Sequence, residues 1–234
     1  MKKFIIFMVV IMTCTLSLKS QIFYRLGYNF GGVITPEFNE TIDLYNSNRP
    51  YLDKQMNHLG ILHGPVLGIG LKFPGRPVCM EFTWSNSHNI VSASGTDPNT
   101  NELRTRYVKF RHNCLSYALQ FQIKSIPVLW WGFSVETSRY SQYTRLDTTD
   151  HYSWMDKSIM VEDRLFVVYE LAVSEKIALQ VQPYFQFAWP VTKVWYDQFV
   201  DLALGVPYWE GYSLISVPKN YGILLTLKLG GHNE

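Results

Sequence analysis

The chain has 234 residues, a length that suits one domain or at most two. Charged residues make up only 17% of it and hydrophobic residues 47%, yet the mean hydropathy is neutral at −0.04, which excludes a bundle of membrane-spanning helices. Lys and Arg number 21 against 19 Asp and Glu, and without the three lysines of residues 1–20 the net charge is 18 − 19 = −1, which gives no electrostatic footprint for nucleic acid. Aromatic residues are abundant at 15%.

Residues 1–20 have the three parts of a secretory signal peptide. A basic start precedes an apolar run from Phe4 to Leu16, and small Ser20 ends the segment. The run is too short to span a bilayer, which takes about 20 apolar residues. We therefore expect Sec-type export and cleavage near Ser20, with residues 21–234 as the mature chain. Lipidation of Cys14 is a disfavoured alternative, because bulky residues precede it.

From residue 21 onward, apolar residues recur with a period of two, which is typical of strands rather than helices. Leu115, Tyr117 and Leu119, for example, alternate with Ser116 and Ala118. Eight such segments suit the roughly 9–11 residues of a tilted bilayer-spanning strand. The alternating pattern covers residues 24–30, 67–72, 78–85, 114–123, 129–136, 164–174, 179–189 and 220–229.

The connections between the predicted strands alternate in length. Three are short, at residues 74–77, 124–127 and 174–176. Four are longer and polar, at residues 34–59, 86–101, 137–160 and 190–217. An even strand number with short turns at one end and long loops at the other is the pattern of an outer-membrane barrel, with periplasmic turns and outer loops.

The two faces of the strands separate this barrel from a soluble ligand-binding barrel and from a β-sandwich. The apolar face carries too many large side chains to fit inside eight strands, so it faces lipid, at Leu119, Phe133, Val167 and Leu225 for example. The other face lines the lumen, and because charges there must pair to offset desolvation, we expect a plugged lumen rather than a narrow pore. Its charged residues are Arg25, Lys72, Glu81, Glu136, Arg164, Glu170 and Lys228. The predicted fold is therefore all-β, a closed eight-stranded antiparallel transmembrane barrel.

Tyrosine and tryptophan collect at membrane interfaces, because they combine an apolar body with a polar tip. The predicted interface girdle consists of Trp84, Trp130, Trp131, Trp189, Trp209 and Tyr221. Over residues 21–234, the strand pattern and girdle resemble the small eight-stranded bacterial outer-membrane barrels of the OmpA/OmpX type. The resemblance implies a bacterial outer-membrane location, with outer-membrane lipid and lipopolysaccharide as partners. That family has structural, adhesive and enzymatic members, so it does not define an activity.

Two of the long loops carry apolar residues. In the first, Thr35 and Pro36 predict a helix start, and Pro50 separates this helix from a second short one. In the fourth, apolar residues recur between Phe199 and Trp209. We expect a partly helical first loop, and the two loops either pack on each other or on another protein. The helix face in the first loop consists of Phe38, Ile42 and Tyr45.

Signals for catalysis are weak. His151 and Ser153 lie on one side of an extended segment, with Glu162 or Asp163 as an orienting acid, and this pair resembles that of barrel-type lipid A deacylases. The histidines have no metal-ligand spacing, and no cofactor is expected. The leading hypothesis is a non-catalytic structural or accessory component of a larger outer-membrane complex of the assembly or secretion type. The alternatives are a lipid-modifying hydrolase and a narrow pore.

The mature chain has two cysteines, Cys79 and Cys114, on neighbouring predicted strands. The short turns predict a register in which Cys79 faces Gln122 and Cys114 lies near Ser87. In that register the two cysteines are eight residues apart along the strands, or about 26 Å at 3.3 Å per residue. This distance is far beyond the roughly 7 Å limit of a disulfide, so two free thiols are predicted.

Overall fold

The computed structural model describes residues 21–98, 100–189, 194–195, 197–205 and 215–230. The expected signal peptide, residues 1–20, and Trp209 lie outside these residues. The elements, in chain order, are β1 (Gln21–Ile34), α2 (Pro36–Ser47), β2 (Leu52–Lys54), β3 (Ile61–Lys72), β4 (Val78–Thr96), β5 (Leu103–Gln122), β6 (Leu129–Leu146), β7 (Ser153–Ser174), β8 (Ile177–Ala188), β9 (Val194–Trp195), α3 (Asp197–Leu204), β10 (Ile215–Ser216) and β11 (Lys219–Leu229).

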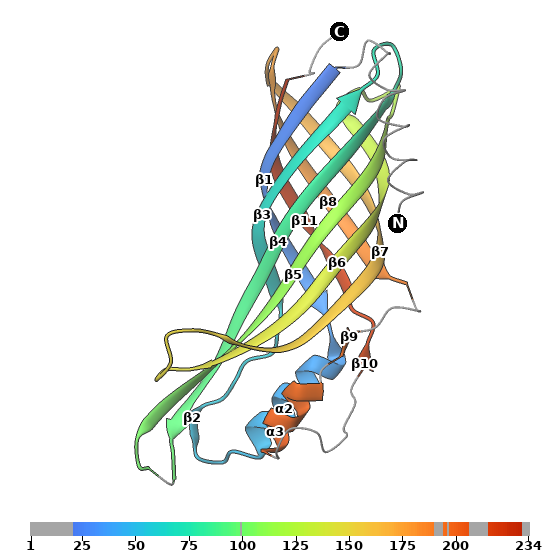
Figure 1. The fold of residues 1–234 in the computed structure, drawn as a ribbon. Coiled ribbons are helices and arrows are strands. Elements are labelled where there is room, and N and C mark those ends of the chain that lie inside the picture. The colour runs from blue at the N-terminus through green and yellow to red at the C-terminus, as the bar shows by residue number, and fades with distance from the viewer. Residues whose placement is uncertain (1–20, 99, 190–193, 196, 206–214, 231–234) are drawn as a thin grey trace.

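Within the described residues, eight antiparallel strands form a closed hydrogen-bonded ring (Figure 1). The ring runs β4-β3-β1-β11-β8-β7-β6-β5, and β5 pairs again with β4. The first and last strands close it, in register from Tyr24 opposite Leu229 to Ile34 opposite Lys219. Because the ring is closed, the backbone N–H and C=O groups of each strand form hydrogen bonds with neighbouring strands, which is required in a lipid environment without water. The predicted all-β, eight-stranded barrel is thus confirmed.

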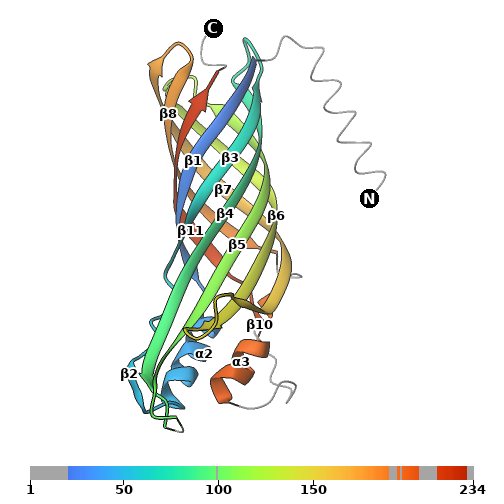
Figure 2. The same ribbon diagram turned by 60° about the vertical axis from the view of Figure 1, so that its left-hand side comes forward.

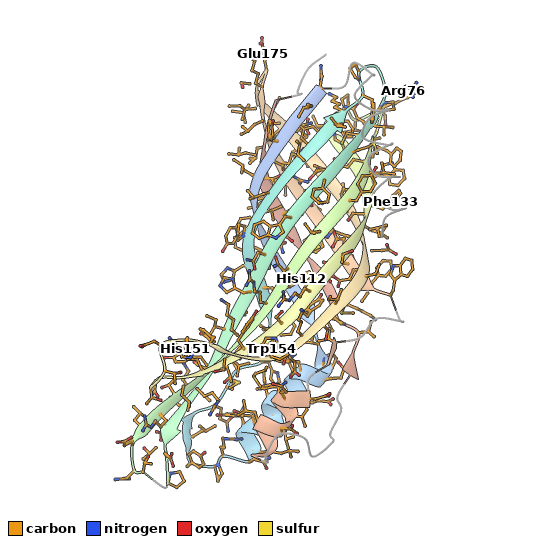
Figure 3. The ribbon with its side chains drawn as sticks, in the orientation of Figure 1. Arg76, His112, Phe133, His151, Trp154 and Glu175 are labelled. Carbon is orange, nitrogen blue, oxygen red and sulfur yellow. The ribbon has the colours of Figure 1, made fainter. Side chains whose placement is uncertain are left out.

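The outer wall of the barrel is apolar and exposed. Phe133, Val167 and Leu225 expose between 38% and 41% of their surface, whereas the neighbouring Ser134 and Val168 point inward and expose 1% or less. Figure 3 shows Phe133 directed away from the lumen. A continuous apolar band of this kind is the lipid-facing surface of a membrane barrel.

Among the described residues, no helix is both long enough and apolar enough to cross a membrane.

The hairpins β4–β5 and β6–β7 extend well past the rest of the barrel at the end opposite the short turns (Figure 1). Strand pairing continues to Thr96 opposite Leu103 and to Thr144 opposite Ser153. The predicted loops 86–101 and 137–160 are therefore wrong, because most of their residues lie in strands. In these segments the outward-facing residues are mostly polar although the strands remain hydrogen-bonded, so the sequence pattern resembles that of a loop. We call this end the outer end, and the end with the short turns the inner end.

Helices α2 and α3 lie side by side at the outer end, next to the extended hairpins (Figure 2). Their apolar faces join one buried cluster with the inward side chains of β4 to β7. At its centre Phe38 stacks on Phe199, with ring centroids 4.8 Å apart, and meets the edge of Phe110 at 5.2 Å. The helix predicted in the first loop is α2. The second helix predicted after Pro50 is wrong, because Leu52–Lys54 forms the short strand β2 on β4.

Both cysteines are free, as predicted, and both are buried. The predicted register was wrong by two residues: Cys79 lies opposite Gln120 and Cys114 opposite Ser85. Six residues along β4 still separate the two positions, or about 20 Å at 3.3 Å per residue, which no disulfide can bridge.

Replacing Val167 with arginine is expected to impair assembly, because a charge on the lipid face near the bilayer midplane costs about 2–4 kcal/mol. The matched control is Val173→Arg, on the same face of β7 but at the inner rim, where the cost is about 0–1 kcal/mol. Urea unfolding of the barrel, followed by its heat-modifiable electrophoretic mobility, measures both variants. Equal stability of the two variants would contradict the assignment of the wall.

Candidate functional site

The lumen is lined by alternate residues of all eight strands. Polar and charged side chains fill most of it, together with a smaller apolar cluster that includes Phe23, Trp130 and Phe166. Six of the seven charged residues predicted to line it expose 6% or less: Arg25, Glu81, Glu136, Arg164, Glu170 and Lys228. The seventh, Lys72, is half-buried at the inner end. The inward positions thus hold both signs of charge at close range, and the structure pairs them in successive groups along the barrel.

The group at the inner end is built around Lys228. Its Nζ lies 3.0 Å from Glu170 Oε2, and Gln180 donates to the same carboxylate at 2.6 Å. The ammonium group also lies above two aromatic rings, 4.6 Å from the Phe23 centroid and 5.9 Å from that of Trp130. The inner mouth is therefore closed by an ion pair with aromatic walls.

The next group centres on Arg25 and Glu81, whose Nη1 and Oε1 atoms are 2.7 Å apart. Arg25 also donates to Thr226 Oγ1 at 2.8 Å and to the side chain of Gln182. Gln120 donates to the second oxygen of Glu81 at 2.7 Å. Both charged groups therefore have several partners, which a buried ion pair needs to offset its desolvation.

A third group joins Arg164 to Glu136, with 3.1 Å between Nη2 and Oε2. Ser134 donates to Glu136 Oε1 at 2.9 Å, and the Cys114 thiol donates to Oε2 at 3.2 Å. The guanidinium of Arg164 lies over the Tyr184 ring, 4.5 Å from its centroid. One of the two free cysteines is thus part of the lumen network.

A fourth group, nearest the outer mouth, was missed by the sequence analysis. Glu162 accepts hydrogen bonds from Tyr140 at 2.8 Å and from Gln186 at 2.9 Å, and its carboxylate lies 3.2 Å from His112 Nε2. Asn220 donates to the Tyr140 hydroxyl at 2.8 Å. The alternation of inward and outward residues continues through this group and could have predicted it. Tyr140, however, falls within the predicted loop 137–160.

The prediction of an interface girdle was wrong for Trp130. It exposes 2% of its surface and lies inside the lumen, where its ring faces Lys228. The adjacent Trp131 points outward with 48% exposed, as do Trp189 with 45% and Tyr221 with 54%. Trp84 also points outward and is half-buried. The pair Trp130-Trp131 shows the rule of strand geometry, since consecutive side chains lie on opposite faces.

The weak catalytic candidates are separated from Glu162, one of the acids expected to orient them. His151 and Ser153 are exposed at the tip of the β6–β7 hairpin, and Figure 3 shows His151 far from Arg76 and Glu175. Glu162 is nine residues from Ser153 along β7, about 30 Å at 3.3 Å per residue, and it bonds His112 instead. Among the described residues, no three His, Cys, Asp or Glu side chains are placed to hold a metal ion.

Asp156 of β7 fixes the start of α3. Its carboxylate accepts hydrogen bonds from the backbone N–H groups of Gln198 at 3.2 Å and Phe199 at 3.3 Å, which have no partner within the helix. Burial raises the pKa of Asp156 from 3.8 to about 6, and nearby Asp197 and Asp201 add to this, against the lowering effect of the two hydrogen bonds. The folded state therefore retains this proton at a pH where the unfolded chain has lost it.

It follows that Asp156 makes the protein less stable as the pH rises from about 4 to about 6, with no further change above that range. We expect Asp156→Asn to remove this part of the pH dependence while retaining a hydrogen-bond acceptor for α3. The measurement is the difference in urea midpoint between wild type and variant at about pH 4 and about pH 7. Asp150→Asn, at an exposed site, is the control. A difference that is the same at both pH values would contradict the assigned role.

The closed eight-stranded antiparallel barrel, with its apolar wall and closely packed lumen, has the architecture of the small transmembrane β-barrels of the OmpA/OmpX type. No protein-family model matches the chain, and no curated protein matches it. Among solved structures, one that is similar is Ail, the attachment invasion locus protein of Yersinia pestis, in complex with the heparin analogue sucrose octasulfate. It is 5% identical, with 91% of this chain and 99% of that chain covered and a TM-score of 0.49.

A second structure of Yersinia pestis Ail is 6% identical, with 91% and 99% of the two chains covered and a TM-score of 0.48. Neisserial surface protein A is 9% identical, with 89% and 96% covered and a TM-score of 0.44. Identities this low carry no information about function.

Proposed function

We propose that the chain is a non-catalytic barrel of the bacterial outer membrane, exported by the Sec route with residues 1–20 removed, and that it acts as a structural or accessory component of a larger outer-membrane complex. The observation that carries the proposal is the double closure of the lumen. Four groups of buried polar side chains fill it, and the α2–α3 cluster covers its outer mouth. A barrel closed in this way works through its surfaces.

The closure argues against the pore alternative. Open diffusion channels have about 16 or more strands, whereas eight strands leave just enough space for side chains. Here both oxygens of Glu81, Glu136 and Glu162 accept hydrogen bonds or face a cation. Opening a path would require breaking these buried pairs, each costing about 3–5 kcal/mol when one partner is lost.

The surface at the outer end is held in a fixed shape. Arg49 stacks on Tyr45 and donates to the carbonyls of Leu202 at 2.7 Å and Ala203 at 2.9 Å, so it ties the end of α2 to the end of α3. Asn46 in turn accepts from the Met56 backbone N–H at 2.9 Å. A preformed surface loses little conformational entropy when a partner binds, which supports a docking role for this end.

Two measurements on the chain, isolated in mild detergent from its native membrane, test the proposal. Native electrophoresis should show a particle larger than the barrel, and Glu40→Arg, on the exposed side of α2, should release the barrel from it. Glu175→Arg, an exposed change at the inner end, is the matched control. In planar bilayers the purified barrel should give no conductance. Reproducible conductance steps would contradict the closed lumen, and migration as a free monomer would contradict the accessory role.

We also propose that outer-membrane lipid, including lipopolysaccharide, contacts a defined part of the wall. A groove of about 280 Å³ there has an apolar floor that includes Trp84, Leu115 and Ile159, with Arg139 and Lys157 also lining it. Neither cation forms an ion pair with a carboxylate among the described residues. This arrangement fits an acyl chain with a phosphate beside it.

The double variant Arg139→Gln and Lys157→Gln is therefore expected to retain less lipopolysaccharide after purification than wild type, because two phosphate contacts are lost. Lys124→Gln with Lys176→Gln makes the same charge change at the inner-end turns and should have no effect. Mass spectrometry of the retained lipid A gives its amount and its acylation. Equal retention by both double variants would contradict the site, and a deacylated species made only by chains with His151 and Ser153 intact would favour the hydrolase alternative.

A further inference from the structure

The outer end holds a cavity of about 390 Å³ that is separate from the lumen groups and from the lipid-facing groove. It lies between the end of α2, the segment that follows it and the inward faces of β4, β5 and β6. Its walls include Tyr45, Arg49 and Tyr51 on one side and Gly95, Arg104 and Arg106 on the other. The volume falls in the range of roughly 300–1,000 Å³ found for small-molecule sites.

The strand register creates this space. Arg104 and Arg106 lie on the inward face of β5, directly opposite the small residues Gly95 and Ala93 of β4. Gly95 is required there, because a Cβ atom at this position would lie 2.5 Å from the Tyr51 backbone oxygen. The close approach brings Tyr51 and β2 against β4, so that they form one side of the cavity.

The charge of the lining is positive and incompletely paired. Three arginines line the cavity against one carboxylate, Asp97. Arg104 pairs with Glu102, but neither Arg49 nor Arg106 forms an ion pair among the residues that the structure describes. Arg106 is half-buried, and its guanidinium donates to the neutral Thr144 hydroxyl at 3.2 Å.

Two tyrosines add neutral hydrogen-bonding groups to the arginines. Tyr45 is buried, and burial raises the pKa of its hydroxyl, against the lowering effect of Arg106 and Arg49. Its hydroxyl therefore stays protonated and can donate or accept a hydrogen bond. Tyr51 is 42% exposed and offers a ring face for stacking. Guanidinium groups beside tyrosines form a surface that binds an anionic group on a polar body.

We propose that this cavity binds a small organic anion of about disaccharide size, with a carboxylate or phosphate group held by Arg106 and the polar body beside Tyr45 and Tyr51. Arg106 supplies the positive charge, because the N–H donors of its planar guanidinium match the oxygens of either a carboxylate or a phosphate. Arg49 positions the wall through its bonds to the end of α3, and Arg104 lies within the same lining. The observations that support this site do not depend on the docking role proposed for the outer end.

Calorimetry on the purified, detergent-solubilised barrel tests the site with three probes. Digalacturonate carries carboxylates, glucose 6-phosphate carries a phosphate, and maltose is a neutral disaccharide. We expect at least one anionic probe to bind and maltose not to bind, and the stronger anion identifies which oxyanion the site prefers. Arg106→Gln should weaken binding roughly tenfold to a hundredfold, because a charged hydrogen bond is lost. Arg106→Lys should retain part of the affinity.

Arg145→Gln is the matched control, since Arg145 lies opposite Tyr107 on the outward face of the same strand pair. It removes the same charge from the same end and should leave the affinity unchanged. If Arg106→Gln fails the heat-modifiable mobility test for folding, Arg104→Gln replaces it, with weakened binding as the expected result. The proposal is overturned if neither anion binds at millimolar concentration, if maltose binds as well as they do, or if Arg145→Gln weakens binding as much as the cavity variants.

Discussion

The strand number fixes the width of the lumen, because a closed sheet of eight strands has an interior that side chains just fill. The wall must be apolar to face lipid, so the polar half of each strand has to point into this narrow space. Charges enclosed there are stable only when paired and hydrogen-bonded. The groups around Lys228, Arg25, Arg164 and Glu162 meet this requirement with partners from several strands.

The same constraint explains the outer end. Above the lipid, the inward face of the extended hairpins no longer encloses a full ring, and its side chains become apolar at Val108 and Phe110. These residues need a cover, which α2 and α3 provide through Phe38 and Phe199. Where β4 and β5 continue past this cluster, arginines replace the apolar side chains and the cover is incomplete. The cavity lies at this boundary between apolar packing and solvent.

The molecule divides its chemistry between three surfaces. The wall is apolar and its groove carries two cations. The lumen is a closed core, and the outer end presents two helices and a basic cavity. His151 and Ser153 are exposed at a hairpin tip, whereas Glu162, one of the acids expected to orient them, contacts His112 in the lumen. In many proteins, the binding residues lie on loops that a rigid scaffold holds in position.

The sequence by itself determined the barrel, its two faces and the helix from Pro36, because a period of two and the turn residues are local properties. The prediction of free thiols also holds, since Cys79 and Cys114 are far apart in both the expected and the observed register. It did not determine which charges pair: Arg25 and Glu81 are 56 residues apart and Lys228 and Glu170 are 58 apart. Only the strand register decides these contacts, and the register expected from the turns was wrong by two residues. The inward position of Trp130 follows from its alternation with Trp131, so the sequence contained that information. The tertiary structure alone showed that the predicted loops 86–101 and 137–160 are mostly strand, because polarity does not distinguish a loop from a strand that has left the membrane.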